Sequence, residues 1–304
     1  MTRVCFVGVG RLGGHLAASL VRNGYAVTVH DVDRAAARRL EDAGAEWADS
    51  PAAAAARGAD VAVTCLPSPG AVAAVVEGED GVLATMAPGA TWIDMSTNDR
   101  RELLRLAEVA SAQGVNTLEA PLTGGVHLAA TRDITMFVGG DETVVDAQRP
   151  LLEAMCGRIF HVGPLGSATD LKLITNMLAF VHLVACGEAL MLAQRAGLDL
   201  ALAFDAIRAS SGNSFVHETE SQVILSGSYD IGFTVDLALK DLSLVLELGD
   251  EAGVPLGLAR YVRERFVEAR ERYGGSAWSP MVVKLLEDEL GVELRAPGFP
   301  ASLV

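Results

Sequence analysis

The sequence predicts an α/β protein with two domains of different class. The first is a doubly wound sheet with helices on both faces, and a long inter-domain helix joins it to an all-α C-terminal domain. Over the first half, short apolar runs alternate with helical patterns, which is typical of a parallel sheet. From about residue 167 onward the apolar periodicity is helical throughout. A chain of 304 residues, 50% of them hydrophobic, exceeds what one core usually serves. We therefore predict domains at residues 1–163 and 164–304.

The first predicted strand runs directly into a glycine-rich turn. An apolar run at residues 3–7 precedes the motif GVGRLG at residues 8–13, and a helical pattern follows. GxGxxG between a strand and a helix is the fingerprint of a dinucleotide-binding Rossmann fold. Gly8 permits the tight turn, Gly10 lets the backbone approach a pyrophosphate, and Gly13 lets helix and strand pack closely. The turn therefore predicts a site for NAD or NADP, whose phosphates would meet the helix N-terminus.

The next strand ends in a carboxylate. Asp31 follows the strand Ala26–His30 and lies eighteen residues past Gly13, where a dinucleotide fold places the acidic residue that holds the adenosine ribose. An aspartate there repels a 2′-phosphate, which favours NAD over NADP. Alternatively, Asp31 caps a helix that starts near Arg34. Arg34 itself weakens the NAD preference without reversing it, so NADP stays possible.

Two further strands end in residues suited to the cofactor. The apolar run at residues 60–65 leads into Leu66 and Pro67, and the run at 91–95 leads into Thr97. In open α/β sheets, ligands bind beyond the carboxyl ends of the strands. We therefore predict that these three residues contact the dinucleotide, the alternative being that they are ordinary turn residues.

A hydroxyl and two glycines follow the strand predicted at residues 116–120. Thr123, Gly124 and Gly125 offer a side-chain donor and closely approachable backbone N–H groups, an arrangement suited to a carboxylate. The same residues are also compatible with a plain loop before the strand predicted at 134–138.

A glycine-bearing loop at residue 163 then becomes a long apolar helix that reaches residue 197 and joins the two domains. Lys172 and Asn176 are its strongly polar pair before His182, and their i, i+4 spacing puts them on one helical face. A solvated lysine near a helix start is the alternative, but the helix dipole disfavours a cation there. Further helices are predicted at residues 200–209, 234–253, 256–273 and 281–290.

Taken together and in this order, these motifs resemble the β-hydroxyacid dehydrogenase family, which includes 3-hydroxyisobutyrate dehydrogenase and tartronate semialdehyde reductase. The resemblance extends over essentially the whole chain. The motifs that carry it are residues 8–13, Leu66-Pro67, Ser96-Thr97, residues 119–125, residues 166–176 and Lys240-Asp241.

The resemblance implies a role for each matching residue. Lys172 matches the family's catalytic lysine, and Asn176 matches an asparagine that orients the substrate. The predicted substrate-binding residues are Thr123, Gly124, Gly125, Asn213, Phe215, Phe233 and Lys240, although aromatic residues such as Phe215 and Phe233 more often belong to the core. The predicted cofactor-binding residues are Gly8, Gly10, Arg11, Leu12, Gly13, Asp31, Leu66, Pro67, Thr97, Lys240 and Asp241.

The chain departs from the family pattern at several positions that bear on the pocket. Thr123 replaces a serine, which keeps the hydroxyl and adds a methyl group. Glu119 replaces an aspartate, and Phe215 replaces a common tryptophan. Residues that stand where the family usually has glycine are Leu128, Arg132 and Ala168. These changes leave the expected chemistry intact but alter the size and shape of the substrate site.

The chemistry that the resemblance implies is reversible hydride transfer between the alcohol carbon of a small β-hydroxy acid and the nicotinamide. Lys172 would accept the hydroxyl proton in oxidation and donate one in reduction. The base role needs a neutral amine, so we expect burial and a second cation, Lys240, to lower the pKa of Lys172. No metal ion is required.

Three other functions fit parts of the pattern. An oxidative decarboxylase like 6-phosphogluconate dehydrogenase carries a histidine and a glutamate where this chain has Thr175 and Ala179. An imine reductase of the same architecture usually lacks the lysine, whereas a semialdehyde reductase catalyses the same reaction in reverse. A non-catalytic dinucleotide-sensing module would not need Lys172, Asn176 or the Thr123 loop.

Composition restricts the partners and the location. A formal net charge of −15 without a basic patch argues against nucleic acid as a partner. The four cysteines are scattered in apolar runs, as expected of free thiols in the cytoplasm. The most apolar stretch, residues 177–193, contains His182 and Glu188 and predicts a buried helix instead of a membrane anchor. The apolar helical half predicts a homodimer or homotetramer.

Overall fold

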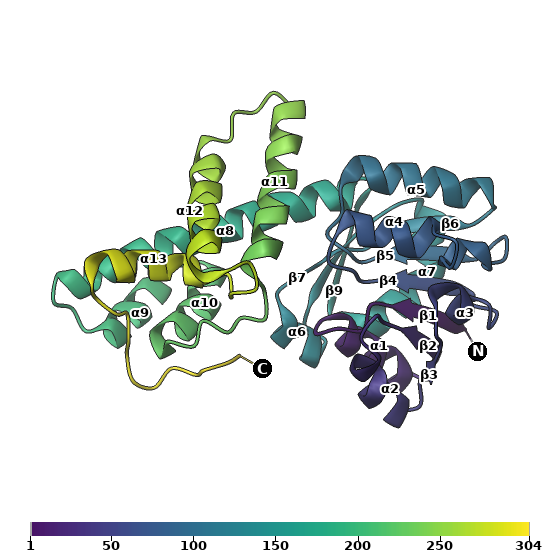
Figure 1. Cartoon of the computed structure of the whole chain (residues 1–304), viewed down its shortest axis with the longest axis horizontal. Coiled ribbons are helices and arrows are strands. Elements are labelled where there is room, and N and C mark those ends of the chain that lie inside the picture. Colours follow the sequence, from purple (N-terminus) through teal and green to yellow (C-terminus); the bar gives the residue numbers. More distant parts are fainter. Residues whose placement is uncertain (1, 304) are drawn as a thin grey trace. The chain divides into compact units, whose positions relative to one another are not determined.

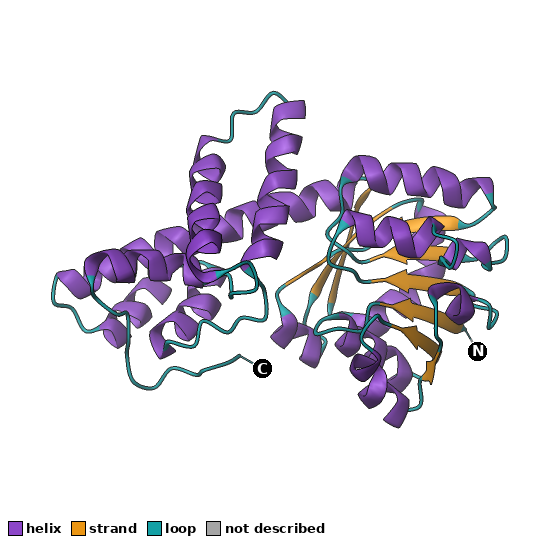
Figure 2. Cartoon of the chain, viewed as in Figure 1, coloured by secondary structure: helices purple, strands orange, loops and turns teal. Residues whose placement is uncertain are grey.

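The computed structural model describes residues 2–303 and divides the chain into two compact units, one up to Lys172 and one from Leu173 onward (Figure 1). The division falls within helix α8, Ser167–Arg195, so the first turn of this helix belongs to the first unit. The α/β class and the helical C-terminal region that the sequence predicts are confirmed, and Figure 2 shows strands in the first unit only.

The first unit is built on one sheet with the order β3-β2-β1-β4-β5-β6-β8-β7, and β9 pairs with β8. Strands β3 to β6 of this order are parallel, but β8 runs antiparallel to β6 and β7. The sheet is therefore mixed at one side, which the sequence did not predict. The strands are β1 (Arg3–Val7), β2 (Ala26–His30), β3 (Glu46–Trp47), β4 (Val61–Thr64), β5 (Thr91–Asp94), β6 (Asn116–Glu119), β7 (Leu122–Thr123), β8 (Thr135–Gly139) and β9 (Arg158–Gly163).

Helices cover both faces of this sheet (Figures 1 and 2). They are α1 (Gly13–Arg22), η1 (Arg34–Ala37), α2 (Arg38–Asp42), α3 (Pro51–Ala55), α4 (Pro69–Glu77), η2 (Val82–Ala84), α5 (Arg100–Ala112), α6 (Val126–Thr131) and α7 (Glu142–Met155). Along β1, Val4 and Phe6 belong to the hydrophobic core that includes α1, whereas Cys5 and Val7 belong to the core that includes α4 and α5. A strand buried on both faces reads as a continuous apolar run, which is why the sequence reveals the parallel strands.

The second unit is all-helical. Its helices after α8 are α9 (Leu200–Arg208), α10 (Phe215–Ser226), α11 (Val235–Glu251), α12 (Gly257–Tyr273) and α13 (Met281–Leu290). Within this unit, the sequence analysis did not predict helix α10. Its signals were present, because the Ser214 hydroxyl caps its N-terminus and Gly227 ends it in the left-handed conformation.

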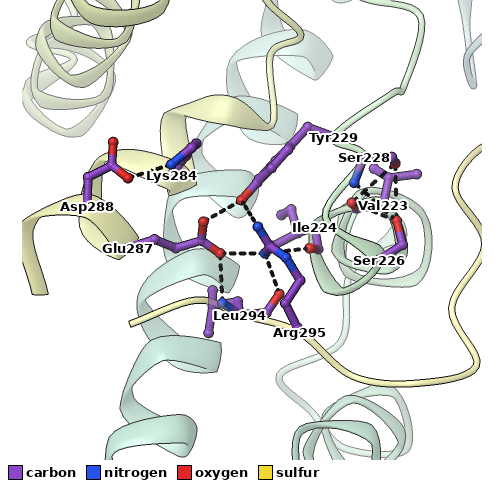
Figure 3. A network of polar contacts seen from close by, with 10 residues as sticks. All are labelled: Val223, Ile224, Ser226, Ser228, Tyr229, Lys284, Glu287, Asp288, Leu294 and Arg295. Atoms are coloured by element: carbon purple, nitrogen blue, oxygen red, sulfur yellow. Dashed lines mark hydrogen bonds and ion pairs between the residues drawn. The ribbon is translucent and has the colours of Figure 1, made fainter. Parts of the chain in front are cut away.

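A buried carboxylate fixes the C-terminal segment of this unit (Figure 3). Glu287 accepts hydrogen bonds from the Tyr229 hydroxyl, from the Leu294 N–H at 2.8 Å and from Arg295 Nη1 at 2.9 Å. Arg295 also donates to the Tyr229 oxygen at 3.1 Å. Because each buried polar group has a partner, the network ties residues 294–295 to α13 and to the loop after α10.

Helix α8 is apolar enough, by length and composition, to cross a membrane, with a mean hydropathy of 1.6 over its most apolar window. Only 33% of that window is buried within the chain, so the expectation of a buried helix is wrong for much of its length. Its exposed side chains include Ile174, Leu178 and Leu192. A core or interface helix satisfies the same test, so this one helix does not establish a membrane span.

Candidate active site

The glycine-rich turn at the end of β1 has the geometry that its motif predicts. Gly8 has φ +92°, and a Cβ there would overlap the carbonyl oxygen of Cys65 at the end of β4. A Cβ at Gly13 would overlap the Gly8 carbonyl oxygen, which is the close helix–strand contact. A Cβ at Gly10, by contrast, would meet nothing within 4 Å. The backbone at Gly10 is therefore open to a ligand, as a pyrophosphate site requires.

Asp31 is tied to this turn. Its Oδ2 accepts the Val9 N–H at 2.8 Å, and its Oδ1 accepts the Asp33 N–H at 2.9 Å. The alternative that Asp31 caps the next helix is wrong, because Asp33 accepts the Ala35 N–H and is the N-cap of η1. Asp31 is thus a carboxylate fixed beside the second position of the glycine motif.

The loops after β4 and β5 are joined by a buried polar network that the sequence analysis missed. Asp94, at the end of β5, accepts from the Thr64 hydroxyl at 2.9 Å, from the Ser96 N–H at 3.1 Å and from the Asn98 amide at 2.9 Å. The Ser96 hydroxyl in turn accepts the Leu66 N–H at 2.9 Å. Burial raises the pKa of the Asp94 carboxyl, and these hydrogen bonds oppose the rise. The network fixes the loops that carry Leu66, Pro67 and Thr97.

The Thr123 loop begins as β7 and continues into α6. Gly124 and Gly125 have φ values of +124° and +85°, which favour glycine. Arg132 ends α6 in the left-handed region with φ +68°, so it keeps a glycine-like conformation where the family has glycine. Such a conformation costs a non-glycine residue on the order of 1 kcal/mol.

Glu119, at the carboxyl end of β6, holds the start of α8. Its Oε1 accepts the Ala168 N–H at 2.9 Å, and its Oε2 accepts both the N–H and the hydroxyl of Thr169, at 2.9 and 2.6 Å. Gly139 on β8 makes room, because a Cβ there would overlap Glu119 Oε1. Burial raises the pKa of Glu119, against these hydrogen bonds. A carboxylate here satisfies the N–H groups that a helix N-terminus leaves without intrahelical partners.

A second contact places the start of α8 beside the N-terminus of α5. Asp170 pairs with Arg100, the first residue of α5, at 3.6 Å between Oδ2 and Nε. A Cβ at Gly166 would lie 2.7 Å from the same Nε, so the glycine permits this approach. The first turn of α8 is therefore anchored at the carboxyl end of β6 and at the N-terminus of α5. Lys172 follows in the second turn of α8 and is only 8% exposed, which is rare for lysine.

In the helical unit, Asp241 lies between two residues of the predicted site. Its Oδ2 accepts from Asn176 Nδ2 at 2.6 Å, and its Oδ1 pairs with Lys240 Nζ at 3.0 Å. The Asp241 side chain is buried. Asp241 was predicted as a cofactor contact, and in this structure its two carboxylate oxygens contact Asn176 and Lys240. The ion pair with Asp241 also offsets the positive charge that we expected Lys240 to supply as a second cation.

The three predicted pocket-wall residues differ in environment. Phe233 stacks on Phe180 with ring centroids 6.1 Å apart and packs against the helical core. Asn213 donates to Glu218 Oε1 at 2.6 Å. Phe215, the first residue of α10, is 54% exposed. Asn213 and Phe215 are therefore exposed, whereas Phe233 is half-buried.

The cysteines are free, as expected: Cys5, Cys65, Cys156 and Cys186. Burial raises the pKa of the Cys5 and Cys65 thiols to about 12, so neither is a nucleophile at neutral pH. Among residues 2–303, no group of His, Cys, Asp or Glu side chains could hold a metal ion.

Two family profiles match the chain. Residues 3–163 match the NAD binding domain of 6-phosphogluconate dehydrogenase, and residues 166–286 match the NAD-binding domain of NADP-dependent 3-hydroxyisobutyrate dehydrogenase. The chain is 35% identical to 3-hydroxyisobutyrate dehydrogenase of Pseudomonas aeruginosa, over 92% of this chain and 97% of the relative. It is 31% identical to 2-(hydroxymethyl)glutarate dehydrogenase of Eubacterium barkeri, over 96% and 97%.

The fold comparison agrees. The structure of 3-hydroxyisobutyrate dehydrogenase from Salmonella typhimurium has a TM-score of 0.87 and 30% identity, and the match covers 94% of this chain and 100% of that one. Other relatives, at about the same identity, are named L-serine and L-threonate dehydrogenases. The chain therefore binds a nicotinamide dinucleotide and belongs to the β-hydroxyacid dehydrogenase family, as an NAD(P)-dependent hydroxyacid dehydrogenase.

Proposed function

We propose that this dehydrogenase oxidises a short β-hydroxy acid with NAD, or reduces the corresponding semialdehyde, with Lys172 as the general acid and base. The observation that carries the proposal is the anchoring of α8. Glu119, at the end of β6, and the Arg100–Asp170 pair, at the start of α5, fix its first turn. The loop with Thr97 follows β5, and the loop with Thr123 follows β6.

The residues at the carboxyl ends of the parallel strands fit a nicotinamide dinucleotide. The open backbone at Gly10 and the N-terminus of α1 suit the pyrophosphate, and Asp31 suits a ribose diol. Arg11, Leu12, Leu66, Pro67 and Thr97 stand in the adjoining loops. The dinucleotide, when bound, supplies the hydride acceptor at C4 of the nicotinamide.

In oxidation, Lys172 Nζ accepts the hydroxyl proton of the substrate while the C–H hydrogen leaves as hydride. In reduction the same group donates the proton and stabilises the developing alkoxide. The low exposure of Lys172 supports this role, because a structural lysine normally keeps its ammonium in water. Burial also removes competing water from the proton acceptor.

The substrate carboxylate fits the Thr123 loop. The hydroxyl of Thr123 and the backbone N–H groups of Gly124 and Gly125 can bind a carboxylate without a charged side chain. Asn176 lies one helical turn beyond Lys172, and Asp241 fixes its amide. We propose that this amide orients the reacting oxygen and that Lys240 approaches the substrate and cofactor.

A panel of acids tests the reaction. The purified chain, with NAD, is expected to form NADH with at least one of four acids: 3-hydroxyisobutyrate, L-serine, L-threonate and 2-(hydroxymethyl)glutarate. Because Thr123 adds a methyl group to the pocket, we expect kcat/KM to be highest for the smaller acids, by about 10-fold or more. If the chain binds NADH but converts none of them in either direction, the dinucleotide-sensing alternative replaces this proposal.

We further propose that the enzyme prefers NAD, on account of the Asp31 carboxylate. Asp31→Asn removes the negative charge that repels a 2′-phosphate and keeps the size of the side chain. The ratio of kcat/KM for NADP to that for NAD should rise by about 10-fold, an effect of about 1.4 kcal/mol. Initial rates with both cofactors measure it, with Asp99→Asn, a helix cap of α5, as the matched control. An unchanged ratio in Asp31→Asn contradicts the ribose role.

The remaining proposals concern assembly and location. The exposed apolar side chains of α8 suit burial against a second copy, as a homodimer or homotetramer. Sedimentation of the purified chain measures this. We place the protein in the cytoplasm, where free thiols persist.

A further inference from the structure

Arg34 is the cation nearest in sequence to the carboxylate on which the NAD preference rests. Asp31 Oδ1 accepts the N–H of Asp33, and Arg34 follows as the first residue of η1. Val32, between them, is fully exposed, so this corner of the unit is accessible. An arginine in such a place can accommodate the 2′-phosphate of NADP, because its planar fork binds phosphate through two hydrogen bonds.

In this chain the guanidinium is engaged by two other groups. Its Nη1 and Nη2 donate to Glu41 Oε2 and Oε1 at 2.5 and 2.8 Å, which is a bidentate pair. Its Cζ also lies 4.4 Å from the ring centroid of Trp47 on β3. The arginine is therefore held by a carboxylate at its edge and by an aromatic ring at its face.

The Trp47 ring is itself fixed. Its Nε1–H donates to Asp49 Oδ1 at 2.8 Å, and the His30 ring lies 5.4 Å away between centroids. The His30 Nδ1 is 2.9 Å from the Ala48 carbonyl oxygen, which restrains that ring as well. A fixed platform lowers the entropy cost of holding the long Arg34 side chain in one geometry, which is what weakens most exposed ion pairs.

We infer that Glu41 is a specificity residue, which keeps Arg34 from the 2′-phosphate of NADP and so enforces the use of NAD. The inference rests on the proposed function, since it deepens the assignment of Asp31 as the ribose ligand. Glu41 acts in two ways: it occupies both Nη groups of the guanidinium, and it adds a negative charge close to where the phosphate would bind. Asp31 repels the phosphate directly, whereas Glu41 removes the residue that would attract it.

Direct binding tests the inference without any need for turnover. NADH and NADPH are titrated separately against wild type and Glu41→Gln, and the dissociation constants are read from nicotinamide fluorescence. Glu41→Gln should lower the Kd of NADPH by about 5-fold, the scale set by one exposed ion pair, and leave the Kd of NADH unchanged. The gain should shrink as the salt concentration rises, because it is electrostatic.

Two further variants identify the residue that is released. In Glu41→Gln/Arg34→Ala the gain should disappear, and Arg34→Ala alone should leave NADPH binding as in wild type. Glu77→Gln is the matched control, because Glu77 binds Arg105 by two hydrogen bonds, of 2.5 and 2.9 Å, between α4 and α5. Glu77→Gln should leave the Kd of both NADH and NADPH unchanged.

The outcomes separate this inference from the proposed function. The inference is wrong if Glu41→Gln leaves NADPH binding unchanged, if it improves both cofactors equally, or if the gain survives Arg34→Ala. A wild type that binds NADPH as tightly as NADH contradicts the NAD preference instead, and the Glu41 variants still decide the role of Arg34.

Discussion

Replacing Lys172 by alanine is expected to lower kcat by about 10²-fold or more, with the affinity for NAD nearly unchanged. The lysine is the proposed proton acceptor, and its loss leaves only water to take the proton. Its backbone position on α8 is fixed by hydrogen bonds of Glu119 to Ala168 and Thr169, which the substitution does not touch. Alanine also favours a helix, so the fold should persist.

Steady-state rates with the best acid of the panel, and a separate NADH titration, measure this effect. Lys172→Arg keeps the charge but cannot lose its proton, so it should be nearly as slow as the alanine variant. Lys284→Ala, which removes a lysine paired with Asp288 on α13, controls for loss of a surface charge. Retained turnover in Lys172→Ala would refute the assignment and leave Lys172 as a structural residue.

Glu119→Gln is expected to cost about 2 kcal/mol of unfolding free energy and to lower kcat by about 10-fold. Glu119 is 1% exposed and accepts three hydrogen bonds from the start of α8. A glutamine replaces one acceptor oxygen by a donor, so a buried donor of Ala168 or Thr169 loses its partner. The start of the helix that carries Lys172 should shift, and proton transfer is sensitive to small displacements.

Chemical denaturation and kcat, corrected for the folded fraction, separate the two effects. Glu119→Asp, which keeps the carboxylate and has the residue usual in the family, should lie between wild type and Glu119→Gln in both. Glu287→Gln is the matched control, since Glu287 is also a buried carboxylate with three donors but fixes the C-terminal segment. It should lower stability and spare kcat. If Glu119→Gln behaves like Glu287→Gln, Glu119 only stabilises the fold.

Much of the fold can be predicted from the sequence because its signals are local. The motif at residues 8–13, the strand Ala26–His30 and the helix Met281–Leu290 were predicted with the bounds that the structure has. Each depends on periodicity, or on glycines whose conformation is set by adjacent residues. The two-residue strands β3 and β7 are too short for any period to show. The strand β8 was predicted, but its antiparallel direction is set by its pairing with β6 and not by its own residues.

The candidate site was predictable only in its residue types. Ordered motifs along the chain predicted a dinucleotide, a carboxylate-binding loop and a catalytic lysine, and the family match confirms the dinucleotide. Tertiary structure decided which side chains fix these loops and the start of α8 in place. Asp94, Glu119 and Asp241 each contact groups that lie 30 to 65 residues away in the sequence, and no local pattern encodes such pairs.

The same division applies to Arg34. The sequence by itself determined that a cation follows Asp31, and left open whether it serves NADP. Only the fold brings Glu41 of α2 and Trp47 of β3 against its guanidinium. The physical reason is that the electrostatic energy of a charged side chain depends mainly on the groups within a few ångströms of it, and the fold of the chain determines which groups these are.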